Sequence, residues 1–149
     1  KKHIMEHVAP LGNVYQAGTL SGNPIAMIAG YTLLNELKSN PSLLTELDAK
    51  TTYLKDGLDK VLKESGIPYQ LNHLGSMISI FFNGKPVTDF ASAATSDIDL
   101  FKKFFHAMLK RGIYLPPSAY ESWFLNNALT TEDLDKTIAA VRESLSEIL

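Results

Sequence analysis

The chain has 149 residues, of which 45% are hydrophobic and 20% charged, which is the size and composition of an ordinary globular domain. Its net charge of −2 excludes a basic field that would attract nucleic acid or an acidic membrane surface. Because the chain has no cysteine, it can form no disulfide framework, thiolate metal site or thiol nucleophile, and we expect a reducing, cytoplasmic location. No apolar run approaches the roughly 20 residues of a membrane span.

Four helices are predicted, and the first two follow clear start signals. The first begins after Asn23-Pro24, because Asn is a good N-cap and Pro is favoured at the first helical position. The second begins with Pro41 at its first position and ends at Gly66, and its leucines recur with a period near 3.6 residues. Small residues in the first helix, among them Gly30, indicate a close packing partner.

The third and fourth predicted helices also carry capping residues. Residues 96–99 have the form of a capping box, and the helix that follows ends at Gly112. The fourth starts near Thr130, with Asp133 three residues later, and keeps one apolar face to the end of the chain.

Short strand candidates lie between these helices. Residues 76–82 give the best one, which ends at Asn83-Gly84, and weaker candidates are 69–72, 113–115 and 123–126. The order of elements predicts an α+β fold with a small, mostly antiparallel sheet covered by helices on one face. A long helical segment is predicted to precede this α+β unit.

The loop of residues 14–24 is the segment best suited to chemistry. It is rich in small residues, carries the hydroxyls of Thr19 and Ser21, and leads into a helix N-terminus. Backbone N–H groups and the helix dipole at such a place favour an anion such as phosphate. The plainer interpretation, a loop that only caps its own helix, is favoured by the residues alone.

The sequence Tyr15-Gln16-Ala17-Gly18-Thr19, continued by Leu-Ser-Gly-Asn-Pro, resembles a signature of the glutamate-1-semialdehyde aminomutases, a branch of the class-III aminotransferases. Further likeness follows in order along the chain, at residues 75–89, 104–109 and 111–121, so it covers essentially all 149 residues. Members are pyridoxal-phosphate enzymes of fold type I. The resemblance implies that residues 1–40 are the end of a large cofactor domain and residues 41–149 a small C-terminal α+β domain.

The resemblance also implies site residues. Gly18 and Thr19 would bind the cofactor phosphate of a neighbouring subunit in a homodimer, and Tyr15 and Gln16 would line that pocket. Glu121 matches a family glutamate near the amino groups of the substrate, where it would position them or move a proton. An isolated glutamate is otherwise more often a solvated loop residue.

Four positions depart from the family pattern. The family often has a small residue at the position of Ser122 and a histidine at that of Leu129, so we expect no catalytic role for residue 129. Asn126 and Asn127 stand where serine and an apolar residue are more usual, so this end of the pocket would differ.

The lysine that holds the cofactor covalently as a Schiff base would lie before the loop of residues 14–24, and no lysine of this chain has its context. The chain starts without methionine and inside what looks like a helix, which we interpret as a cut piece. We therefore expect a fragment without activity of its own.

Three functions remain open. The first is a fragment of an aminomutase that converts glutamate-1-semialdehyde, a small molecule, to the tetrapyrrole precursor 5-aminolevulinate. The second is a fragment of another class-III aminotransferase. The third is an inactive structural or dimerisation module, and we expect the isolated piece to self-associate. No metal site is expected, because His3 and His7, at i and i+4, more plausibly form a surface pair.

Overall fold

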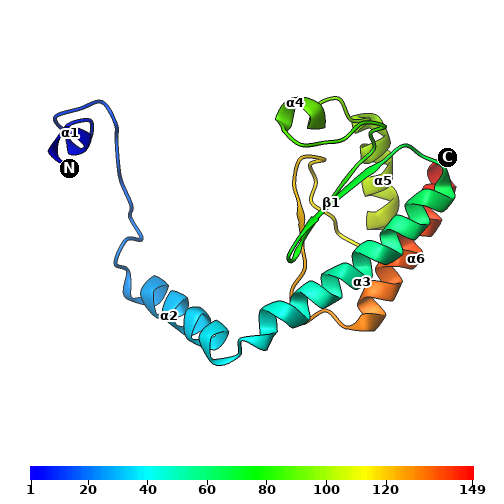
Figure 1. The fold of residues 1–149 in the computed structure, drawn as a ribbon, viewed down its shortest axis with the longest axis horizontal. Helices are drawn as coiled ribbons and strands as arrows, with labels where there is room; N and C mark the ends of the chain where they lie inside the picture. The colour runs from blue at the N-terminus through cyan, green and yellow to red at the C-terminus, as the bar shows by residue number, and fades with distance from the viewer. The chain divides into compact units, whose positions relative to one another are not determined.

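The computed structural model describes residues Lys1–Leu149, which form two compact units, Lys1–Asn40 and Pro41–Leu149 (Figure 1). The first unit contains helices α1 (Lys2–Met5) and α2 (Pro24–Ser39). The second contains α3 (Ser42–Ser65), β1 (Gln70–Leu74), β2 (Met77–Phe81), α4 (Phe90–Ala93), α5 (Ile98–Lys110), β3 (Trp123–Phe124) and α6 (Thr131–Ile148). The predicted α+β class is confirmed. The assignment of the first unit to a larger cofactor domain stays a prediction.

The predicted caps of α2 and α6 are confirmed. The side chain of Asn23 accepts hydrogen bonds from the N–H groups of Ile25 and Ala26, at 3.0 and 3.1 Å, and Pro24 is the first helical residue. At α6, Thr130 and Asp133 form a reciprocal capping box. These short-range polar pairs are local in sequence, which is why the sequence alone identifies them.

The predicted starts of the other two long helices are wrong in detail. Pro41 is the N-cap of α3 rather than its first residue, although Gly66 ends the helix with φ +72° as expected. At α5 the cap is the single side chain of Asp97, which accepts from the N–H of Leu100 at 2.8 Å. No reciprocal bond forms there, because the third helical residue is Leu100, which has no polar side chain.

The sheet has three antiparallel strands in the order β1-β2-β3. Residues of β2 alternate in burial, and Ile78 and Ile80 point into the core with exposures of 0% and 5%. The helix α3 packs near β1 and β2, so the helices and the apolar side of the sheet share one core. The opposite face of the sheet carries Met77 together with the exposed ring of Phe124.

The predicted strand at residues 113–115 is wrong. The N–H of Ile113 donates to the carbonyl of Met108 and that of Gly112 to Leu109, both at 3.0 Å, so the amides close the last turn of α5. Gly112 supplies the required left-handed conformation, with φ +79°. Leu115 is still buried, so its apolar character reflects packing rather than strand pairing.

The core of the second unit is centred on α3 and α6, which lie side by side (Figure 1). Contacts join Tyr53 to Asp135 and Glu64 to Arg142, so the two helices run in the same direction. Side chains that are fully buried between the helices and the sheet include Leu58, Leu62, Ile78, Phe104, Met108, Val141 and Leu145. None of the six helices has the length and apolar character that a membrane span requires.

The first unit exposes more apolar side chains than an ordinary surface helix would. The helix α2 has no buried residue, and its large apolar side chains are exposed. They are Ile25, Met27, Ile28, Tyr31, Leu33 and Leu34, each at least 58% exposed. Helices of this kind draw most of their stability from packing, so this apolar surface requires a partner.

The contact between α3 and α6 at Gly57 gives the first prediction. A β-carbon at Gly57 would lie 2.8 Å from Cγ1 of Ile138 and closer still to its Cδ1. Gly57→Ala should therefore lower the free energy of unfolding by about 1 kcal/mol, because overpacking outweighs the gain in helix propensity. In the Ile138→Ala background the same change should stabilise by about 0.5–1 kcal/mol. Urea denaturation of the wild type and the three variants measures the coupling between the two positions, and equal effects of Gly57→Ala in both backgrounds would contradict it.

Candidate functional site

The loop before α2 keeps its polar groups exposed. Tyr15 is 83% exposed, and Gln16, Gly18 and Thr19 are exposed as well. The side chains of Tyr15, Gln16 and Thr19 make no hydrogen bond within the chain, whereas the N–H of Ser21 donates to the carbonyl of Gly18 at 3.0 Å. This bond makes a tight turn directly after the Gly-Thr pair. The structure therefore brings all four predicted loop residues onto one exposed segment.

The N-terminus of α2 has no free donor for an anion. Pro24 has no N–H, those of Ile25 and Ala26 bind the side chain of Asn23, and that of Met27 binds its carbonyl. The helix end is thus satisfied by its own cap, as the plainer interpretation of the sequence held.

The free donors lie a few residues earlier. The N–H groups of Gly18, Thr19 and Leu20 make no hydrogen bond within the chain, and neither does the hydroxyl of Thr19. A β-carbon at residue 18 would contact the hydroxyl of Ser21, so a larger residue there would require the Ser21 side chain to move. Several N–H donors beside one hydroxyl fit the phosphate of a cofactor, which accepts strong hydrogen bonds.

The other predicted site residue, Glu121, belongs to the second unit. It lies between Pro116 and β3, and its side chain is exposed and forms no ion pair or hydrogen bond. Its N–H donates to the carbonyl of Ser118 at 3.1 Å. The preceding residue, Tyr120, does have a packing partner, because its ring lies on that of Phe90 with ring centroids 5.5 Å apart.

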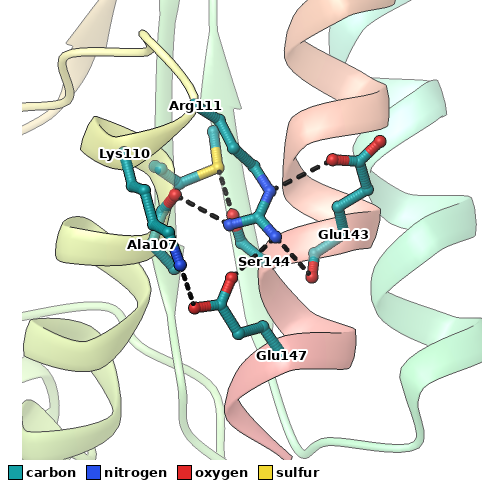
Figure 2. Close-up of polar contacts among 7 residues, drawn as sticks. Ala107, Lys110, Arg111, Glu143, Ser144 and Glu147 are labelled. Carbon is teal, nitrogen blue, oxygen red and sulfur yellow. Dashed lines mark hydrogen bonds and ion pairs between the residues drawn. The ribbon is translucent and has the colours of Figure 1, made fainter.

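Glu121 also lines an open groove of about 1120 Å³ between residues 111–125 and α6. The other charged side chains of this groove are already paired. Figure 2 shows the guanidinium of Arg111 between Glu143 and Glu147, with nitrogen–oxygen distances of 3.1 and 2.7 Å. Lys136 pairs with Glu132 at 2.9 Å, and Asp133 caps α6. Glu121 is therefore the one charged group of the groove that is free to act on a ligand.

The asparagines that depart from the family pattern have structural partners. The ammonium of Lys50 donates to the carbonyl and side-chain oxygens of Asn127, at 2.7 and 2.9 Å. The side chain of Asn126 accepts the N–H of Ala128 at 3.0 Å, which forms a turn. Leu129 packs against the core and lines the groove. The bonds between Lys50 and Asn127 therefore anchor the segment after β3 to α3.

The family model for class-III aminotransferases matches residues 1–149. The chain belongs to the class-III aminotransferase family. The resemblance inferred from the loop and from the segment around Glu121 is thereby confirmed, although no comparison tests the roles of individual residues.

Within the class-III aminotransferases, the chain is similar to several curated aminomutases. The glutamate-1-semialdehyde 2,1-aminomutase of Flavobacterium johnsoniae is 54% identical over 141 residues, covering 95% of this chain and 33% of that protein. The protein of the same name from Thermus thermophilus is 51% identical over 145 residues, covering 97% and 34%. The chain therefore spans about a third of the length of the curated relatives it matches.

Solved structures share the fold. An omega-transaminase from Sphaerobacter thermophilus superposes with a TM-score of 0.73 at 23% identity, covering 99% of this class-III aminotransferase chain and 34% of the other. A glutamate-1-semialdehyde aminomutase from Pseudomonas aeruginosa gives 0.64 at 18% identity, covering 72% and 24%. At such identities the likeness shows the fold alone.

Sequence reasoning missed the contacts that hold the Glu121 segment. The most direct is between the hydroxyls of Ser79 and Ser122, 2.8 Å apart and partly buried. The hydrogen bonds from Lys50 to Asn127 span 77 positions in sequence. Neither has a local signal, because each depends on strand register or on where α3 passes the loop.

The charge network of Figure 2 gives a pH prediction. Hydrogen bonds from Lys110 and, second, Arg111 hold the pKa of Glu147 below its ordinary value of 4.5. A lowered pKa in the folded state stabilises the protein above pH 4.5, and the contribution is lost as the pH falls through the folded value. Carboxyl NMR should show the titration midpoint of Glu147 rising toward 4.5 in Lys110→Gln and unmoved in the control Lys60→Gln. A midpoint unchanged in Lys110→Gln would contradict this cause.

Proposed function

We propose that the chain is the part of a homodimeric, pyridoxal-phosphate-dependent aminomutase that converts glutamate-1-semialdehyde to 5-aminolevulinate, a step toward tetrapyrroles. The observation that carries the proposal is the 54% identity over 95% of the chain to a relative of that name. The free donors of the Gly18-Thr19 turn and the unpaired carboxylate of Glu121 support it. We also propose a cytoplasmic location, which rests on the composition without cysteine.

The turn would serve the phosphate end of the cofactor. When bound, pyridoxal phosphate supplies an electron sink and carries the amino group. The N–H groups of Gly18 and Thr19 and the hydroxyl of Thr19 would bind the phosphate held by the partner subunit, and Tyr15 and Gln16 would line that pocket. Their exposure within this chain is what such donation to a neighbour requires. The exposed apolar side chains of α2 support the same association.

Glu121 would act on the substrate rather than on the cofactor. A carboxylate without a partner can accept hydrogen bonds from an ammonium group and so fix which of two amino groups faces the reacting carbon. It can also hold a proton that moves between those positions. The pairing of every other charge in its groove leaves these tasks to Glu121.

A second candidate is an aminotransferase of this family that acts on another amine. The leucine at position 129, where the family often has a histidine, favours it. The two are separated by giving the longer protein that contains this chain either glutamate-1-semialdehyde alone or an amine with a keto acid. Formation of 5-aminolevulinate without a second substrate supports the aminomutase. Turnover only with the amine and keto acid pair would overturn it.

The phosphate role of Thr19 is tested by Thr19→Val in that longer protein. Loss of a hydrogen bond to a charged group should weaken cofactor binding about 10- to 100-fold, because such bonds contribute roughly 1.5–3 kcal/mol. Fluorescence titration of the cofactor-stripped protein with pyridoxal phosphate measures the affinity.

The matched control is Thr52→Val, since Thr52 is exposed on α3 and its hydroxyl makes no hydrogen bond. Equal affinities of Thr19→Val and the control would show that the turn does not bind the phosphate.

A further inference from the structure

The strand that leads away from Glu121 is very short. β3 has two residues, and its pairs with β2 are Phe124 with Met77 and Trp123 with Ile78. Extending this register by one residue places Ser122 opposite Ser79. Their hydroxyl oxygens lie 2.8 Å apart in a partly buried position. A side-chain bond thus continues the strand pairing beyond the point where β3 ends.

This bond is adjacent to the one unpaired charge of the groove. Glu121 precedes Ser122 and has no partner for its own carboxylate, so its position is set by its neighbours. On the other side, the Tyr120 ring packs on Phe90, and the N–H of Tyr120 donates to the hydroxyl of Ser118 at 3.2 Å. The Ser79–Ser122 bond is the corresponding attachment to the sheet.

We propose that Ser79 and Ser122 are positioning residues for Glu121, which hold its backbone against β2 so that the carboxylate keeps one place in the groove. Without the bond, strand pairing would end at Trp123, two residues from Glu121, and the intervening backbone would be free to fray. For a residue that aligns a reacting group, a displacement of about 1 Å can cost a large factor in rate. The catalytic part of this inference rests on the proposed function, whereas the positioning part does not.

The positioning is tested by amide hydrogen exchange in this 149-residue chain. Ser79→Ala removes the bond without changing any residue next to Glu121, so intrinsic exchange rates in that segment stay the same. Exchange of the Glu121 N–H should accelerate about 3- to 10-fold, the factor expected for loss of one neutral hydrogen bond. The amide of Leu125, which donates to the carbonyl of Ser76 at 3.0 Å, should be unaffected.

Two further variants serve as controls. Ser79→Thr keeps a hydroxyl and should restore slow exchange at Glu121, whereas Ser146→Ala makes the same chemical change on an exposed face of α6 and should alter nothing there. If exchange at Glu121 in Ser79→Ala stays within about twofold of the wild type, the positioning role is overturned.

The catalytic consequence is tested in the longer protein by a double-mutant cycle. Ser79→Ala should lower kcat about 3- to 10-fold with little change in KM, and should have no further effect when Glu121→Gln is already present. An equal loss of kcat in both backgrounds would show that Ser79 does not act through Glu121. If Glu121→Gln alone leaves kcat unchanged, the role proposed for Glu121 fails, while the exchange measurement still decides the positioning.

Discussion

The packing of α3 on α6 is the contact on which the rest of the second unit depends. Gly57 allows the two helices to approach closely at Ile138, and the core that forms beside them receives Ile78 and Ile80 from the sheet. Because β2 is fixed in this way, the short strand β3 can pair with it and carry Glu121 to the groove. The position of a single exposed carboxylate thus follows from apolar packing elsewhere.

Much of this fold could be predicted from the sequence, since capping residues and apolar periodicity are local signals. Asn23, Gly66 and the Thr130–Asp133 pair mark helix ends that the structure confirms. The predicted strand at residues 113–115 was wrong because a neighbouring element overrode the local signal: the amides of Gly112 and Ile113 close α5. The short helix α4, capped by Asp89 and Ser92, was not foreseen at all.

The candidate site likewise has features that the sequence could predict and features that it could not. The Gly18-Thr19 turn and Glu121 could be chosen from motifs, and the structure adds why they are suited to binding: their donors and carboxylate have no partner within the chain. What anchors Glu121 could not be predicted, because the Ser79–Ser122 bond exists only once the register of β2 and β3 is known. The difference has a physical reason. Residues of a binding motif are neighbours in sequence, whereas the hydrogen bond that holds Glu121 in place joins residues that only the tertiary structure brings together.

The central claim is that this class-III aminotransferase chain supplies phosphate donors and a substrate carboxylate but no lysine that holds the cofactor. Several of its lysines are engaged elsewhere, for example Lys50 with Asn127 and Lys63 with Asp59. The most direct measurement is a titration of the 149-residue chain with pyridoxal phosphate, followed by borohydride reduction and mass mapping of the labelled residues. The account predicts only scattered, substoichiometric labelling. A single lysine labelled at one equivalent per chain would contradict it.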